Sequence, residues 1–341
     1  MKNRTLGSSG IEVSPICLGT MMFGDRTDAA ESARIVANAR DAGVNFIDTA
    51  DVYAKGESER ITGKLISPER GQWILATKVA NAMGEGPENQ GLHRGHMTRA
   101  IDASLKRLGT DYIDLYYLHK DDTATPLTET LETMAGFIRA GKVRHFALSN
   151  FRAYRIAEVI RLCDAIGMPR PVCLQPYYNA MNRMPEVEVL PACAYYGLGV
   201  VPYSPLARGV LTGKYVPDAA PPEGSRGGRS DKRMMQTEFR RESMEHAQAM
   251  AAHAKTRGIT PGEFATAWVL ACEHVSSVLA GPRTLEQWTG YLGALDYKWT
   301  AEDEALVDSL VPPGHPSTPG YSDPMYPFHG RTRAGNPVLS S

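Results

Sequence analysis

The chain has 341 residues, 43% of them hydrophobic, and its 37 basic side chains nearly balance 38 acidic ones, for a formal charge of −1. This length fits one large or two ordinary domains, and the near-neutral charge argues against nucleic acid, an anionic membrane or a polyacidic partner. Because the N-terminus lacks the apolar core of a signal peptide and no stretch approaches the ~20 apolar residues of a membrane span, we expect a soluble cytoplasmic protein.

Short apolar runs alternate with helical patterns along most of the chain. Several runs, including VNFID, WILATK and YIDLYYLH, are continuously apolar or aromatic, which is typical of strands buried on both faces of a parallel sheet. The predicted strands are residues 16–19, 44–48, 74–78, 112–119, 143–149, 172–175, 199–203 and 277–280. The predicted helices are residues 28–41, 58–65, 96–108, 127–139, 154–165, 187–195, 242–256, 261–271 and 285–292, and many end at a glycine that favours a left-handed C-cap.

Eight strands that alternate with helices fit either a (β/α)₈ barrel or an open doubly wound sheet. The doubly wound sheet should carry GxGxxG after its first strand, and the chain contains no such pattern. We therefore predict an α/β fold of the (β/α)₈ TIM-barrel type, forming one domain over residues 1–311. A long loop at residues 212–231 and an irregular tail at residues 312–341 are the two expected insertions, since both are rich in glycine and proline.

Catalytic groups of a barrel gather at the carboxyl ends of its strands. Asp48, Lys78 and His119 end three successive predicted strands, and Tyr53 lies in the loop after Asp48. Adjacent strands lie ~4.8 Å apart, so these four side chains should meet at one rim. Each alone has a structural explanation: a capping carboxylate, a packed tyrosine, a lysine that reaches solvent or a buried histidine.

Taken together, the four residues favour a catalytic role over a purely structural one. A lysine at the inner end of a strand needs a nearby carboxylate, and Asp48 lies on the neighbouring strand. The ammonium of Lys78 should lower the pKa of Tyr53 from ~10 towards neutrality. Tyr53 would then act as a general acid in a reaction that develops an oxyanion, with His119 as a second donor that orients the substrate oxygen.

These residues stand in motifs that resemble those of the aldo-keto reductase superfamily: NFIDTADVY, ILATKV and DYIDLYYLH. The opening RTLGSSGIEVSPICLGTMMFG resembles the family's N-terminal hairpin and first strand. GKVRHFALSNF, QPYYN, VVPYSPLARGVLTGKY and VLAGPRTLEQ resemble its later strands and cofactor segment, in order. The resemblance implies a barrel that binds NADPH and reduces an aldehyde or ketone to the alcohol. Hydride would come from nicotinamide C4 and the proton from Tyr53, while Lys78 and Asp48 tune Tyr53 and His119 guides the carbonyl.

The resemblance also implies a set of cofactor contacts, among which Asp48 is counted. They are Gly19, Thr20 and Met21 for the nicotinamide ribose; Ser149, Asn150 and Gln175 for the carboxamide; Tyr203 for stacking on the nicotinamide; Ser204, Leu206, Arg208 and Gly209 for the pyrophosphate; and Gly281, Arg283, Thr284 and Gln287 for the 2′-phosphate end. Two features depart from the family pattern. Gly290 and Tyr291 replace the usual Glu-Asn pair that reads adenine, and Pro282 stiffens the turn before Arg283.

Two other functions remain open from the sequence. A redox-sensing NADP(H)-binding regulatory subunit would keep the same four residues, because some members of the superfamily are regulatory or channel-associated. A metal-dependent hydrolase would need histidines and carboxylates at several strand ends, whereas His119 stands alone and His93 and His96 lie in a glycine-rich loop. The sequence leaves self-association open and no metal is expected.

The substrate is expected to be a small carbonyl compound that is apolar or aromatic, since Met21, Met22, Phe23 and Tyr53 lie near the predicted mouth. The tail adds Tyr321, Tyr326 and Phe328 among prolines. Two arrangements of the tail are considered: it folds over a barrel mouth, or it is disordered.

Overall fold

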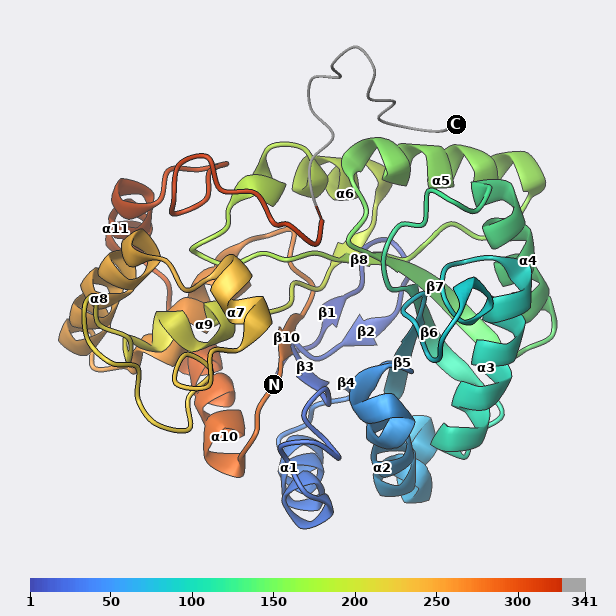
Figure 1. Ribbon diagram of the computed structural model, residues 1–341, viewed down its shortest axis with the longest axis horizontal. Helices are drawn as coiled ribbons and strands as arrows, with labels where there is room; N and C mark the ends of the chain where they lie inside the picture. The colour runs from blue at the N-terminus through green and yellow to red at the C-terminus, as the bar shows by residue number, and fades with distance from the viewer. Residues whose placement is uncertain (327–341) are drawn as a thin grey trace.

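Eight parallel strands form one sheet in the order β10-β3-β4-β5-β6-β7-β8-β9 in the computed structural model, which describes residues 1–326. Parallel bridges from Val200 to Val275 and from Tyr203 to Leu279 join the two outer strands and close the sheet. The predicted (β/α)₈ barrel is therefore confirmed (Figure 1). The strands are β3 (Ile16–Gly19), β4 (Phe46–Asp48), β5 (Ile74–Val79), β6 (Ile113–Leu118), β7 (Val143–Ser149), β8 (Cys173–Gln175), β9 (Gly199–Val200) and β10 (Val278–Ala280).

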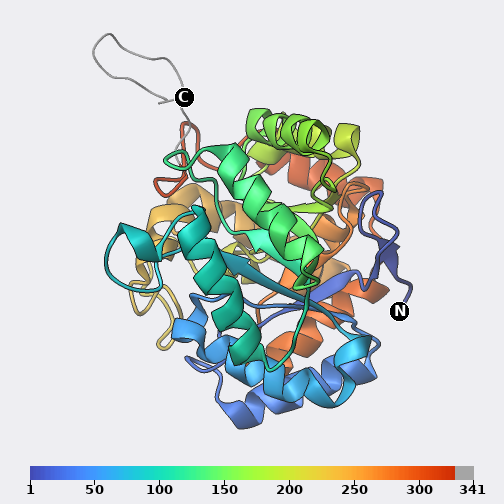
Figure 2. The ribbon, with the colours of Figure 1, turned by 90° about the vertical axis from the view of Figure 1, so that its right-hand side faces the viewer.

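Helices surround the barrel on the outside (Figures 1 and 2). They are α1 (Ala29–Asp41), α2 (Glu57–Ile66), α3 (Arg94–Leu108), α4 (Leu127–Arg139), α5 (Ala153–Ile166), α6 (Val189–Tyr196), α7 (Lys232–Thr237), α8 (Arg241–Thr256), α9 (Pro261–Ala271), α10 (Leu285–Gly293) and α11 (Ala301–Leu310). Short 3₁₀ helices lie at Tyr53–Gly56, Ser67–Gln72, Pro87–Asn89, Met184–Glu186, Ala207–Thr212 and Ala294–Asp296. Within residues 1–326, no helix combines the length and the apolar character that crossing a bilayer requires.

The sequence patterns missed two helices and overextended several strands, most of all the one predicted over residues 199–203. Helix α7 is only six residues long and has no periodic pattern to detect. Helix α11 carried a readable signal, because Thr300 and Asp303 form a capping box at its start. The predicted strand 199–203 shrinks to β9 because Pro202 has no N–H to donate to the ladder.

The interior of the barrel places the chemistry at one end. A hairpin of β1 (Arg4–Thr5) and β2 (Glu12–Val13) supplies Leu6 and Val13 to the apolar cluster inside the barrel. The hairpin lies opposite the mouth loops (Figure 2). Side chains alternate along a strand, so residues two places beyond an interior residue also face inward. The interior layer Phe46, Ala76, Tyr117, Ala147 and Cys173 is thus followed, towards the mouth, by Asp48, Lys78, His119, Ser149 and Gln175.

A pair of buried carboxylates lies just outside the barrel wall. Glu59 of α2 accepts hydrogen bonds from Thr77 at 2.6 Å and from the guanidinium of Arg107 at 2.6 Å. Asp51 follows β4, and neither of its buried carboxylate oxygens has a hydrogen-bond partner within residues 1–326. Burial, and then the charge of Glu59, raise the pKa of Asp51 to about 8.

We expect Asp51→Asn to increase the free energy of unfolding at pH 7.5 but not at pH 4. The folded protein keeps a proton on Asp51 that the unfolded chain, with an ordinary pKa of 3.8, releases. Folding stability therefore falls as the pH rises through the interval from about 4 to about 8, and the amide removes this loss. Chemical denaturation across this pH range measures the effect.

Asp122→Asn is the matched control with the opposite sign. Burial acts against the Asp122 carboxylate, but hydrogen bonds from Thr125 and the backbone outweigh it and lower its pKa, so its replacement should destabilise the protein at pH 7. Equal stability of wild type and Asp51→Asn across the whole pH range would contradict the interpretation of Asp51.

Candidate active site

A cavity of about 520 Å³ opens at the carboxyl ends of the strands and extends towards α10. Most of the residues that the sequence singled out line it: Gly19, Met21, Asp48, Tyr53, His119, Ser149, Asn150, Gln175, Tyr203, Ser204, Leu206, Arg208, Gly209, Gly281, Arg283 and Gln287. Lys78, Thr20 and Thr284 do not. Lys78 lies buried beneath the floor, the Thr20 hydroxyl donates to the carbonyl of Asp48, and Thr284 caps α10.

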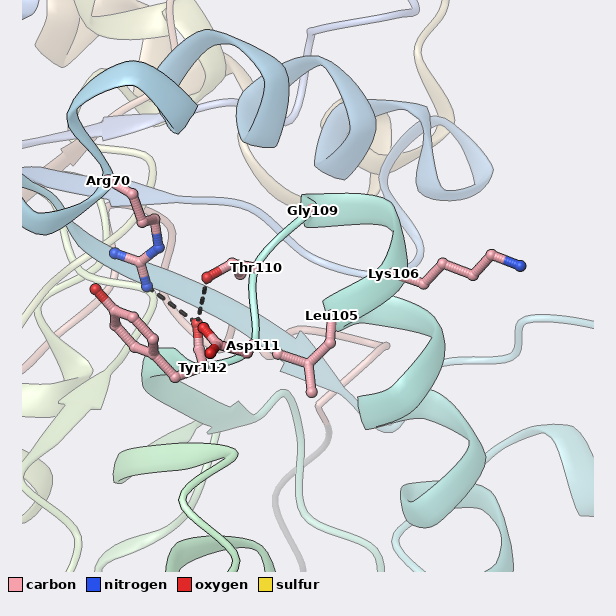
Figure 3. Close-up of a pocket in the computed structure, with 7 residues that line it drawn as sticks. All are labelled: Arg70, Leu105, Lys106, Gly109, Thr110, Asp111 and Tyr112. Carbon is pink, nitrogen blue, oxygen red and sulfur yellow. Dashed lines mark hydrogen bonds between the residues drawn. The ribbon is translucent and has the colours of Figure 1, made fainter.

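A second hollow, of about 580 Å³, lies at the opposite ends of the strands (Figure 3). Its Tyr112 directly precedes β6 and lies between the guanidinium groups of Arg70 and Arg144, at 4.2 and 3.9 Å from the ring centroid. Asp114 pairs with both arginines, which balances much of their charge. The groups suited to proton transfer are in the first cavity, so we take that cavity as the candidate active site.

Lys78, Asp48 and Tyr53 form one hydrogen-bonded chain at the cavity floor. The Lys78 ammonium donates to the Asp48 carboxylate, to the Thr49 carbonyl at 2.8 Å and to the Tyr53 hydroxyl at 3.2 Å. Its side chain is fully buried. Burial lowers the pKa of Lys78, but the adjacent Asp48 and Tyr53 outweigh burial, so the pKa is raised and the group remains an ammonium.

The pKa of Tyr53 differs from the sequence-based expectation. The surrounding protein raises the pKa of the phenol above 10, and the opposing effect of the Lys78 charge is smaller. The predicted shift towards neutrality is therefore wrong: desolvation of the phenolate outweighs the cation, part of whose charge Asp48 already balances. Tyr53 holds its proton at neutral pH and has an ammonium 3.2 Å away that would stabilise the phenolate once the proton leaves.

His119 is placed as a neutral hydrogen-bond donor. Burial, and then the charges of Lys78 and Lys120, lower its pKa well below the ordinary value. The Asn81 amide lies 2.9 Å from Nδ1, and with its nitrogen donating there, the proton of the neutral ring is on Nε2. The Tyr53 and His119 rings meet edge to face at 5.9 Å, and both side chains line the cavity.

Part of the cavity wall is a rigid aromatic and amide surface. Tyr203 stacks on Tyr177 at 5.6 Å between centroids, and its hydroxyl donates to Asn150 at 2.8 Å. The Asn150 amide donates to the carbonyl of His119 at 2.9 Å, and the Gln175 amide donates to the carboxylate of Asp48 at 3.1 Å. These bonds fix a flat ring and two amides at the place where a planar amide-bearing ring would fit.

The segment after Tyr203 has an unusual backbone. Ser204, Ala207 and Arg208 have φ values of 59°, 46° and 52°, and Gly209 follows at 98°. Non-glycine residues rarely adopt this left-handed conformation, and runs of it aim backbone N–H groups at anions. Strain of this kind concentrates at binding sites.

Three cations gather at the far end of the cavity without counter-ions. Lys214 and Arg226 come from the loop between residues 212 and 231, and Arg283 comes from the turn before α10. Within residues 1–326, no carboxylate forms an ion pair with any of the three. Burial and the charges of the neighbouring arginines lower the pKa of Lys214, which means that this end of the cavity favours an anion.

Tyr291 lies beside this cationic end and is almost completely buried. The Arg283 N–H donates to the side chain of Gln287 at 2.9 Å, which closes the turn that starts α10. Asn81, Tyr177, Lys214 and Arg226 were absent from the sequence-based site. Asn81 lies two residues beyond β5, so the rule that catalytic groups gather at the carboxyl ends of strands could have found it. The positions of Tyr177, Lys214 and Arg226 depend on how their loops fold.

The tail lies across the mouth as far as the structure describes it. The Ser317 N–H donates to the carbonyl of Met181, and Asp323 pairs with the guanidinium of Arg233. Arg152 donates to the carbonyl of Tyr326 at 2.7 Å, and Met325 and Tyr326 line the cavity. Tyr321 stacks on Arg240 at 3.8 Å. Of the three aromatic residues singled out in the tail, Phe328 lies outside the described residues.

His93 and His96 do not both lie in a loop as expected, since His93 is the N-cap of α3 and His96 belongs to its first turn. His93 caps α3 by accepting from the N–H of His96 at 3.3 Å, and the ring centroids lie 6.0 Å apart. Among residues 1–326, no three His, Cys, Asp or Glu side chains come together in a metal-binding arrangement.

Comparison with known proteins agrees with this architecture. The profile of the Aldo/keto reductase family matches residues 15–312. A protein of Oryza sativa subsp. japonica named as a probable voltage-gated potassium channel subunit beta is 34% identical over 301 residues, which covers 87% of this chain and 92% of the relative. The uncharacterized oxidoreductase YrpG of Bacillus subtilis is 34% identical over 334 residues, covering 94% and 100%. On the family match and the barrel together, the chain belongs to the aldo/keto reductase family.

Proposed function

We propose that this protein is an oxidoreductase that uses NADPH to reduce an aldehyde or a ketone to the alcohol. The observation that carries the proposal is the Tyr53 hydroxyl, which lies 3.2 Å from a buried ammonium and faces the same cavity as a neutral His119. A proton donor backed by a cation suits a reaction in which a carbonyl oxygen gains negative charge.

The residues present fit the dinucleotide. Lys214, Arg226 and Arg283 form a site for a phosphate, and the left-handed segment at residues 204–209 would lie along the pyrophosphate. Tyr203, backed by Tyr177, offers a ring face to the nicotinamide. Ser149, Asn150 and Gln175 would hold its carboxamide, and Gly19 and Met21 would lie against the ribose. Tyr291 would pack against the adenine in place of the usual amide and carboxylate.

The reduced nicotinamide, when bound, supplies a hydride to the carbonyl carbon. His119 Nε2 and the Tyr53 hydroxyl both donate to the carbonyl oxygen and so fix its position. Tyr53 transfers its proton to that oxygen as negative charge develops, and Lys78 stabilises the resulting phenolate. Asp48 keeps Lys78 charged in a buried position where an unpaired ammonium would be costly.

The substrate end of the cavity favours an uncharged molecule. Met21, Val52, Met325 and Tyr326 supply apolar and aromatic surface beside Tyr53. Arg233, the charged residue that reaches this part of the mouth, is paired with Asp323. An apolar or aromatic carbonyl compound would fit this surface better than a charged one.

A redox-sensing regulatory subunit is the second candidate, because relatives of 34% identity are named as potassium channel subunits. The same active site would serve both functions. Steady oxidation of NADPH with a panel of aldehydes supports the enzyme; NADPH binding without turnover on the panel supports the subunit.

Tyr53→Phe should reduce turnover by a factor on the order of 10² or more while NADPH affinity stays near that of the wild type. The change removes the transferable proton but leaves the surfaces around the cofactor. Single-turnover oxidation of NADPH measures the chemical step, and Tyr195→Phe on the exposed face of α6 is the control. Wild-type chemistry in Tyr53→Phe would show that another group supplies the proton.

Arg283→Ala should weaken NADPH binding by roughly 1.5–3 kcal/mol, the scale of a hydrogen bond to a charged group, and leave NADH binding nearly unchanged. NADH lacks the 2′-phosphate, so the difference between the two cofactors isolates that group. Fluorescence titration of both cofactors measures it, with Arg161→Ala on the exposed face of α5 as control. Equal losses for both cofactors would mean that Arg283 does not contact the phosphate.

Tyr326→Ala should change the ranking of carbonyl substrates by size, because it removes aromatic surface from the mouth but no contact that the cofactor needs. We expect higher KM values for aromatic aldehydes, nearly constant values for small aliphatic ones, and unchanged NADPH affinity. Tyr154→Ala, which removes an exposed tyrosine from α5, is the control. An unchanged substrate profile would place Tyr326 outside the substrate site.

A further inference from the structure

Glu238 is a buried carboxylate for which the proposed chemistry has no use. It follows α7, its side chain is fully buried, and neither carboxylate oxygen has a hydrogen-bond partner within residues 1–326. A buried carboxylate without hydrogen bonds is costly and calls for an explanation.

Its surroundings are cationic, and two of the cations, Arg208 and Arg233, line the active-site cavity. The nearest is Arg208, whose Nε lies 3.9 Å from a carboxylate oxygen of Glu238 and 3.0 Å from the Thr237 hydroxyl. Arg233 of α7 and Arg240 at the start of α8 also act on Glu238. The Tyr177 hydroxyl lies close to the carboxylate, although without good hydrogen-bond geometry, and Tyr321 of the tail also faces it. Arg233 also lines the cavity but is paired with Asp323, and Arg240 bonds to Ser317 and Thr318. Arg208 is thus the cavity arginine whose carboxylate partner, within residues 1–326, is Glu238.

Arg208 therefore lies between the carboxylate of Glu238 and the cavity that would hold the pyrophosphate. On one side is Glu238; on the other is the cavity, where the left-handed segment and Arg208 face the proposed pyrophosphate. Burial raises the pKa of Glu238, and Arg208 opposes this effect. An anion bound to Arg208 would offset part of its charge, and filling the cavity would remove water as well. Both changes favour the protonated carboxyl group.

We propose that Glu238 is the counter-charge of Arg208 and takes up a proton when a pyrophosphate-bearing cofactor binds. Glu238 is a positioning residue here, since it acts through Arg208 and does not touch the cofactor. The inference rests on the proposed function, because it requires a dinucleotide in this cavity.

Linkage between cofactor binding and proton binding by Glu238 sets how the affinity changes with pH. Because the carboxyl group holds its proton more tightly in the complex than in the free protein, binding weakens as the pH rises through the interval between the two pKa values. Within this interval the dissociation constant increases by up to about tenfold per pH unit. Glu238→Gln, which cannot ionise, should bind more tightly at high pH and lose this dependence.

Titration calorimetry with NADPH, in pairs of buffers that differ in ionisation enthalpy, counts the protons exchanged between pH 5.5 and 9. We expect the wild type to take up more protons than Glu238→Gln at some pH in this range. The 2′-phosphate of NADPH also titrates, but its contribution is common to both proteins and cancels in the difference. Glu245→Gln, an exposed change on α8 that removes the same charge, should match the wild type.

Equal proton exchange in wild type and Glu238→Gln at every pH would overturn the proposal, even where the variant is less stable, and would leave Glu238 a structural residue. If Glu238→Gln does not fold, NADH binding to Lys214→Arg decides, because NADH lacks the 2′-phosphate and the arginine removes the titration of Lys214: proton uptake supports the proposal and its absence overturns it. Failure of the wild type to bind either cofactor would overturn the proposed function and this inference together. Binding and aldehyde reduction without the proton difference would overturn this inference alone.

Discussion

The site depends on one buried ion pair, Lys78 with Asp48. Removing either partner of a buried pair costs about 3–5 kcal/mol, because the other charge is left without compensation. Here the pair does more than stabilise the barrel, since the same ammonium reaches the Tyr53 hydroxyl at 3.2 Å. The Gln175 amide and the Thr49 carbonyl complete its hydrogen bonds. The charge that makes Tyr53 useful is thus held in place by three different strand ends.

Charge is arranged along the cavity in two zones. Near the floor, the cation is paired, His119 is neutral and the surface is apolar or aromatic, so a neutral carbonyl compound fits. Towards α10, Lys214, Arg226 and Arg283 have no paired carboxylate within residues 1–326, so that end suits a phosphate. Arg208 lies between the zones, with Glu238 behind it. Under the proposed function, this separation lets one cavity hold a highly charged cofactor and an uncharged substrate side by side.

Much of the candidate site was predictable because it lies on strand ends. A strand places every second side chain inward, so Asp48, Lys78 and His119 were assigned to one rim from their positions alone. The protonation states of these residues were not predictable from strand position. The sequence suggested a lowered pKa for Tyr53, and the structure shows a raised one, because desolvation is a property of everything packed around the phenol. Asn81 was within reach of the strand-end rule, but its contact with Nδ1 of His119, on which the tautomer depends, appears only in the folded chain.

The sequence by itself determined the eight strands, the end of the barrel that holds the candidate site and the strand-end positions of Asp48, Lys78 and His119, because hydrophobic periodicity and strand position are local properties. Only the tertiary structure decided which loop residues reach the cavity. Lys214 and Arg226, and Met325 and Tyr326 across the mouth, are brought there by segments without regular periodicity, held by contacts between residues far apart in the chain such as Arg233 with Asp323. Such contacts form only when the barrel has brought their partners together, and no local pattern encodes them.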